Sequence, residues 1–214
     1  MRFNWVSYSL ATFAFSSGKN TDKQLCMSAS RPTSCPKVGT LLLSEPFNPE
    51  PVFKRSVVLV SQHDRKGTIG FILNKPTMLS VNEALDDFPE FKAIVYWGGP
   101  LKLDSIYYIH TISKLKGRKK IADGLYWGGD YTQLKLMIES GVVRQEDIKF
   151  VAGFSAWTPN QLKEEIVHEN WWVTNADIQS ALIEEPTEVW GNVLKKMGHV
   201  YGILNDFPED PCIN

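Results

Sequence analysis

The chain has 214 residues, of which 43% are hydrophobic and 22% charged, the proportions of a folded globular protein. They exclude a disordered, collagen-like or coiled-coil chain. The 23 basic and 24 acidic side chains nearly cancel, so no strong overall field draws the molecule to nucleic acid or to an anionic membrane.

The three cysteines lie near the ends of the chain, without CxxC spacing: Cys26, Cys35 and Cys212. This pattern predicts neither a disulfide framework nor a metal site. No run of about 18 apolar residues occurs, so the sequence predicts no membrane-spanning helix. We expect a cytoplasmic protein with no cofactor and no membrane attachment.

Residues 1–36 differ from the rest, because serine is abundant, Asp22 is the only acidic residue and no hydrophobic period persists. We expect a disordered extension here, or an over-extended reading frame with Met27 as the true start, and one domain over residues 37–214. Polar residues interrupt the apolar stretch at residues 3–15, so secretion is not predicted. Mass spectrometry of the natural N-terminus would decide whether residues 1–26 are present.

The first half of the domain is predicted to be rich in strands. Residues 57–60 are all apolar, which indicates a strand covered on both faces. Ser80 and Glu83 have the spacing of a capping box for a short helix. The expected strands cover residues 38–45, 55–64, 68–76, 93–99 and 105–112.

Helices are more frequent in the second half. Asp130 is a predicted N-cap for a helix that Gly141 ends, and Thr158 and Pro159 are predicted to begin the next helix. A strand is expected at residues 148–157, a short strand and short helix at residues 170–182, and a last helix from Pro186 to about Met197. Strands followed by helices in irregular alternation favour an α+β fold over a doubly wound nucleotide-binding fold.

Several segments in this order resemble the YqgE/AlgH family over about residues 37–205: GTLLLSEP, FKRSVVLVSQHD, GTIGFILNKP, YWGGP, and GFSAWTPNQLKEEI followed by NWW. The resemblance implies a single α+β domain built around a mixed, barrel-like β-sheet with helices packed outside. Members of this family are described as regulators of transcription, and the family has no established catalytic residues.

A surface for a ligand or partner is predicted where polar and glycine-rich segments follow buried strands, because such rims often carry binding groups. The alternative is that the polar side chains only satisfy backbone groups at the strand ends. The residues of this candidate surface are Arg55, Asn74, Lys75, Gly98, Gly99 and Pro100.

Ser155 lies in a segment similar to the nucleophile elbow of esterases, which makes a serine hydrolase one alternative. The match is incomplete, because the bulky Trp157 stands where the elbow requires a small residue. We favour Ser155 as a turn residue and Trp157 as a core aromatic. His63 and Asp64 are predicted turn residues, and no histidine spacing typical of a metal site occurs.

Direct nucleic-acid binding is the other alternative, through a basic run that is predicted to be an exposed loop. Because the sequence has no helix-turn-helix, zinc-finger or RNA-recognition motif, we rank this function lower. We expect instead a non-catalytic regulatory or binding protein that acts through a protein partner. The basic run consists of Lys114, Lys116, Arg118, Lys119 and Lys120.

Overall fold

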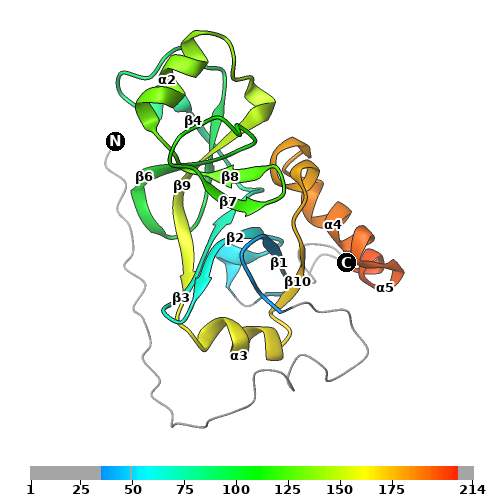
Figure 1. Cartoon of the computed structure of the whole chain (residues 1–214). Coiled ribbons are helices and arrows are strands. Elements are labelled where there is room, and N and C mark those ends of the chain that lie inside the picture. Colours follow the sequence, from blue (N-terminus) through cyan, green and yellow to red (C-terminus); the bar gives the residue numbers. More distant parts are fainter. Residues whose placement is uncertain (1–34, 49, 207–214) are drawn as a thin grey trace, which may run out of the picture. The chain divides into compact units, whose positions relative to one another are not determined.

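The computed structural model describes residues 35–48 and 50–206 of the chain (Figure 1). Almost all of the expected N-terminal extension, including Met27, lies outside the described residues. Although the sequence predicts no disulfide framework, Cys35 is disulfide-bonded.

The described residues form ten strands, whose bounds follow in chain order: β1 (Thr40–Ser44), β2 (Val57–Asp64), β3 (Gly67–Ile72), β4 (Pro76–Ser80), β5 (Ile94–Trp97), β6 (Leu101–His110), β7 (Lys119–Ala122), β8 (Leu125–Trp127), β9 (Ile148–Trp157) and β10 (Trp171–Asn175). The predicted strand at residues 68–76 is divided, because β3 ends at Ile72 and β4 begins at Pro76.

The helices are α1 (Val81–Ala84), α2 (Tyr131–Glu139), α3 (Gln161–Val167), α4 (Val189–Met197) and α5 (His199–Ile203), with short helical turns η2 (Pro51–Phe53), η3 (Gln145–Asp147), η4 (Gln179–Ile183) and η5 (Leu204–Asp206). The predicted caps of α1 and α2 are confirmed. Ser80 Oγ accepts the Glu83 N–H, and Asp130 Oδ1 accepts the Gln133 N–H at 2.9 Å.

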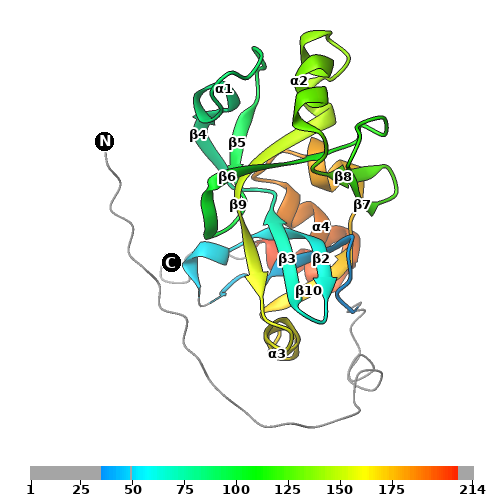
Figure 2. The ribbon, with the colours of Figure 1, turned by 60° about the vertical axis from the view of Figure 1, so that its left-hand side comes forward.

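The α+β class and the mixed sheet are confirmed. The strands follow the order β10-β1-β2-β3-β9-β6-β8-β7, and β5 joins β4 to β9. All pairs are antiparallel except β5 with β9, and β9 has three partners in β3, β5 and β6 (Figure 2). The path is open between β10 and β7, so the expected barrel-like closure is not confirmed.

Strand β2 is covered on both faces, as its apolar run predicts. Val57 and Leu59 belong to a cluster that includes residues of α4, whereas Val58 and Val60 pack in a cluster with Leu162 of α3. Because successive side chains of a strand point to opposite faces, both faces of this strand need apolar residues. A third cluster lies between β5, β6, β9 and α2.

Helix α3 begins at Gln161, so the prediction that Thr158 and Pro159 start it is wrong. Thr158 instead lies in the preceding turn, where its N–H donates to Gln161 Oε1 at 3.2 Å and its carbonyl accepts the Gln161 N–H at 3.2 Å. The last long helix also begins later than predicted, at Val189 rather than Pro186. In both cases a hydrogen-bonded turn precedes the helix.

Candidate functional site

The polar residues of the predicted surface lie together, and Asn74 and Lys75 both form hydrogen bonds with the backbone. Asn74 Oδ1 accepts the Val57 N–H at 2.9 Å, and its Nδ2 donates to the Arg55 carbonyl at 2.8 Å. Lys75 Nζ donates to the Lys54 carbonyl at 3.0 Å, and the Arg55 guanidinium lies 5.0 Å from the Trp190 ring. These contacts fit the alternative interpretation, in which the side chains satisfy strand ends.

The glycine corner of the predicted surface is a packing feature between β3 and β9. Gly98 accepts the Ile72 N–H at 2.9 Å and donates its own N–H to Ala152 at 2.8 Å. Gly98 and Gly99 are buried, and only Pro100 is exposed. Two of the three corner residues are therefore inaccessible to a partner.

Ser155 lies inside strand β9, paired with Gly70, so the prediction of a turn residue is wrong. Its side chain is 1% exposed, and its Oγ has no hydrogen-bond partner in the described part of the chain. A nucleophile elbow instead exposes its serine between a strand and a helix. Trp157 is a core aromatic, as expected, in the cluster that includes Leu162 of α3.

The described histidines do not form a reactive group with Ser155. His63 is exposed in the β2–β3 hairpin, where its Nδ1 lies 2.8 Å from Thr68 Oγ1. His110 is buried, with Nδ1 3.1 Å from the Ile112 N–H and Nε2 2.9 Å from the Gly128 carbonyl. Burial lowers the pKa of His110, an effect to which the Arg118 charge adds and which the bond to Gly128 opposes.

All five residues of the basic run are exposed, and strand β7 includes the last two of them. The Arg118 guanidinium lies 4.9 Å from the centre of the Tyr126 ring, and Lys119 Nζ lies 4.6 Å from that of Trp127. Lys120 forms a 3.3 Å ion pair with Asp123. Three of the five cations thus contact a neighbouring ring or carboxylate. Nucleic-acid binding through this run stays a prediction.

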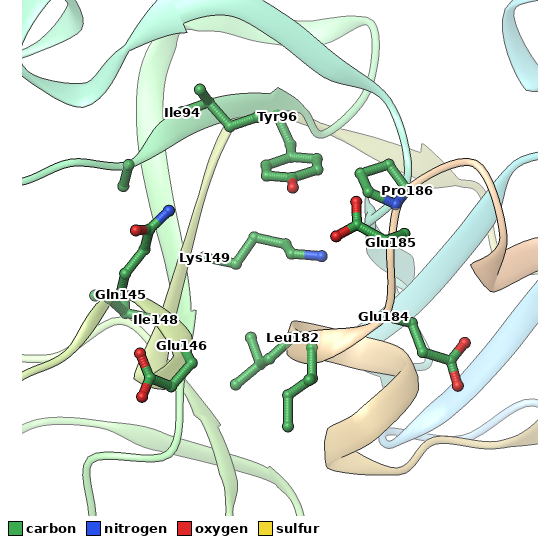
Figure 3. Close-up of a pocket in the computed structure, with 12 residues that line it drawn as sticks. Ile94, Tyr96, Gln145, Glu146, Ile148, Lys149, Leu182, Glu184, Glu185 and Pro186 are labelled. Atoms are coloured by element: carbon green, nitrogen blue, oxygen red, sulfur yellow. The ribbon is translucent and has the colours of Figure 1, made fainter.

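A cavity of about 260 Å³ lies between β5, the start of β9 and the segment that leads into α4. The Lys149 side chain extends across it beside Tyr96, and the Glu185 carboxylate turns toward the lysine amine (Figure 3). Lys149 is 6% exposed. Its Nζ donates to the Leu73 carbonyl at 3.2 Å and lies 4.5 Å from the centre of the Tyr96 ring.

The cavity shifts the pKa values of the Lys149 amine and the Tyr96 phenol. Burial lowers the pKa of Lys149 to about 8, against the opposing effect of the Glu185 charge. Burial and the same carboxylate raise the pKa of Tyr96, so its phenol stays protonated at neutral pH.

Sequence reasoning did not identify this site. The available signal was a single charged residue, Lys149, within the apolar strand IKFVAGF. A lysine is rarely buried without a compensating partner, so it marks a special environment. Nothing in the sequence links it to Tyr96, 53 positions earlier, or to Glu185, 36 positions later.

Beside the cavity, β4 carries an outward bulge. Pro76 and Ser80 pair with Tyr96 and Ile94, so five residues of β4 lie opposite three of β5. Thr77 Oγ1 donates to the Val95 carbonyl at 2.6 Å and accepts the Leu79 N–H at 3.1 Å. The bulge leaves the side chain of Met78 fully exposed.

Comparisons with known proteins agree on one family. The AlgH-like family model matches residues 41–202. A UPF0301 protein from Cytophaga hutchinsonii is 35% identical over 178 residues, which are 82% of this chain and 98% of that relative. UPF0301 protein CT0663 from Chlorobaculum tepidum is 34% identical over 179 residues, or 83% and 96% of the two chains.

Two solved structures share the fold. The crystal structure of protein DIP2367 from Corynebacterium diphtheriae has a TM-score of 0.70 at 23% identity and covers 87% of this chain and 99% of that one. The solution structure of AlgH from Pseudomonas aeruginosa has a TM-score of 0.65 at 21% identity, over 85% and 98% of the two chains. No helix in the described part of the present chain has the length and apolar character needed to cross a membrane.

Proposed function

This chain belongs to the AlgH-like family, and we propose that it is a cytoplasmic, non-catalytic regulatory protein that acts by binding a protein partner. The proposal agrees with the description of YqgE/AlgH proteins as regulators of transcription. The observation that carries it is the exposed Met78 side chain on the bulge of β4.

Met78 has the properties of a binding residue. The two hydrogen bonds of Thr77 hold the bulge on both sides, so the backbone under Met78 is ordered before any partner arrives. Leu79 is the next residue of β4 and is 41% exposed, and Ile94, which pairs with Ser80 at the end of β4, is 42% exposed. Adjoining exposed apolar side chains are typical of protein interaction sites.

The chemistry of these residues favours a protein over a small ion or nucleic acid. Their side chains carry no charge and form no ionic contacts, so affinity must come from removing apolar surface from water. An unbranched thioether fits irregular apolar recesses and adapts to their shape. We therefore expect the partner to offer an apolar recess that receives Met78.

Affinity capture from a cell extract tests the proposal, with the full chain and its Met78→Ser variant as baits. We expect a partner to be recovered at least about tenfold less with the variant, since a residue central to an interface contributes about 2 kcal/mol or more. Leu136→Ser is the matched control, because Leu136 is 59% exposed on α2, a separate element. Equal recovery with both variants, or no partner with any bait, would contradict the proposal.

The non-catalytic part of the proposal has its own test. A serine-reactive phosphonate labels the nucleophile of a serine hydrolase, and we expect no adduct at Ser155, because its Oγ is buried within a strand. An adduct at Ser155 that forms with the native chain and not with the unfolded chain would favour the hydrolase alternative.

A further inference from the structure

The Lys149 cavity holds a combination of groups that protein binding through Met78 does not use. The lysine amine is buried in a cavity, and its neighbours are a carbonyl oxygen and an aromatic ring rather than a contacting carboxylate. Neither neighbour carries a full negative charge. A protonated amine is stabilised less in such a place than in water, so a larger fraction of the amine is neutral than for an exposed lysine.

The neutral form is also the reactive form. With a pKa of about 8, about a tenth of the Lys149 amines are unprotonated at pH 7, whereas an exposed lysine is almost wholly protonated. An unprotonated lysine amine is a nucleophile toward carbonyl carbon. The cavity therefore holds a usable nucleophile under neutral conditions.

The charges around the cavity do not favour an ionic ligand. Glu146 forms a 3.0 Å ion pair with Arg144, and Glu184 a 3.1 Å ion pair with Lys196. The remaining lining carboxylate, Glu185, faces Lys149 itself (Figure 3). Each lining carboxylate thus lies near a cation, and Arg144 and Lys196 also pair with Asp147 and Asp177, so a neutral molecule enters at a lower electrostatic cost than an ion.

We infer that Lys149 captures a small neutral aldehyde or ketone as a reversible Schiff base within this cavity. A volume of about 260 Å³ lies just below the range of sites that hold drug-sized ligands, so the ligand has few atoms. Ile94 and Leu182 line the cavity and provide apolar contacts for its carbon chain. The inference does not rest on the proposed partner binding.

The reaction balances with groups present at the site. The Lys149 nitrogen lone pair forms a bond to the carbonyl carbon, and the Glu185 carboxylate passes one proton from the nitrogen to the carbonyl oxygen, which gives a carbinolamine. The same carboxylate then passes the second nitrogen proton to the hydroxyl, which leaves as water while the C=N double bond forms. Water reverses each step, so the ligand is released unchanged.

Reductive trapping tests the inference with the full chain, propanal as probe and cyanoborohydride as hydride donor. Peptide mass mapping then gives the rate of propylation at each lysine. We expect Lys149 to react at least about tenfold faster at pH 7 than the exposed Lys114, because a larger fraction of its amine is neutral. We also expect the Lys149 rate to rise with pH, to reach half of its maximum near the pKa of about 8, and to level off about one pH unit higher.

Variants separate capture from simple exposure of an amine. Glu185→Gln removes the proton carrier, but it also increases the neutral fraction of the Lys149 amine, because the Glu185 charge raises the pKa of that lysine. The variants are therefore compared above about pH 9, where the amine is largely neutral in either chain. There, Glu185→Gln is expected to slow trapping at Lys149 several-fold, whereas Glu188→Gln, an exposed neighbour outside the cavity, leaves it unchanged. Lys149→Arg keeps a cation and is expected to abolish the fast propylation. Propylation of Lys149 no faster than Lys114, or equal rates in the two glutamine variants, would overturn the inference. Partner capture through Met78 is measured separately, so failure of one proposal leaves the other testable.

Discussion

Glu165 accepts a hydrogen bond from Trp171, with its Oε2 2.7 Å from the indole Nε1. The same oxygen accepts the Trp157 indole N–H at 2.8 Å. Both rings are buried, and they pack edge to face with centroids 5.7 Å apart. One carboxylate on α3 therefore satisfies two buried donors from β9 and β10.

Glu165→Ala should lower the free energy of unfolding by about 2–5 kcal/mol, because each buried N–H left without an acceptor costs about 1–3 kcal/mol. Urea unfolding followed by tryptophan fluorescence measures the change. Glu164→Ala is the control, since Glu164 is exposed on the same helix, and its effect should stay below about 0.5 kcal/mol. Equal effects of the two substitutions would show that the indole bonds do not stabilise the fold.

His110 should make stability depend on pH. Its folded-state pKa lies below the ordinary value of 6.5, chiefly because of burial, so the native state binds fewer protons than the unfolded state. Its contribution is full above pH 6.5 and is lost as the pH falls from 6.5 through the folded pKa. The free energy of unfolding should therefore decline as the pH falls from about 6.5 to 5.

The His110→Gln variant isolates this effect, because glutamine offers an acceptor oxygen and a donor NH2 group but does not titrate. We expect the decline toward pH 5 to be smaller in the variant, as measured by urea unfolding at several pH values. The same decline in both proteins would assign the pH dependence to other groups.

Gly99 should not tolerate a side chain. Its φ of 149° is unfavourable for other residues, and an added Cβ would overlap the backbone of Phe154 in β9. We expect Gly99→Ala to lower the free energy of unfolding by about 3 kcal/mol or more, from backbone strain and overpacking together. Gly141→Ala is matched, with a φ of 70° and no atom within 4 Å of the added carbon, and should cost only about 1–2 kcal/mol. Thermal unfolding of the two variants compares them, and a smaller loss for Gly99→Ala would contradict the packing argument.

Asn74 should act as a structural bridge. Asn74→Ala removes the acceptor of the Val57 N–H and the donor to the Arg55 carbonyl, so we expect a loss of about 2 kcal/mol in the free energy of unfolding. Asn160→Ala is the control, because Asn160 precedes α3 without a side-chain cap bond. If Asn74→Ala unfolds like the native chain yet loses a captured partner, the predicted ligand or partner surface is supported instead.

The sequence was most informative where the signal is local. The apolar run at residues 57–60 predicts the doubly covered β2, and the Ser80–Glu83 and Asp130 caps predict helix starts, because each depends on neighbours within a few positions. The predicted start of α3 is wrong because Thr158 has the residue type of a helix start, whereas in the structure it lies in a hydrogen-bonded turn with Gln161.

The candidate site was not predictable by these means. The Lys149 cavity depends on residues from β5, β9 and the segment before α4, which the chain brings together over long separations. The predicted surface at Asn74 and Gly98 stays a prediction, although these residues follow β3 and β5. Its polar groups, however, bond to backbone that a local pattern does not show.

Strand β9 has a consequence for how the chain acquires its fold. Strands β3, β5 and β6 pair with β9, which lies 38 or more positions later in the chain. Strand β1 pairs with β10, more than 120 positions away. Such high contact order slows folding, because long loops must close before the contacts that stabilise them form. A nascent chain that ends before Ile148 therefore leaves one edge each of β3, β5 and β6 without its partner, a state in which chaperones and aggregation compete for it.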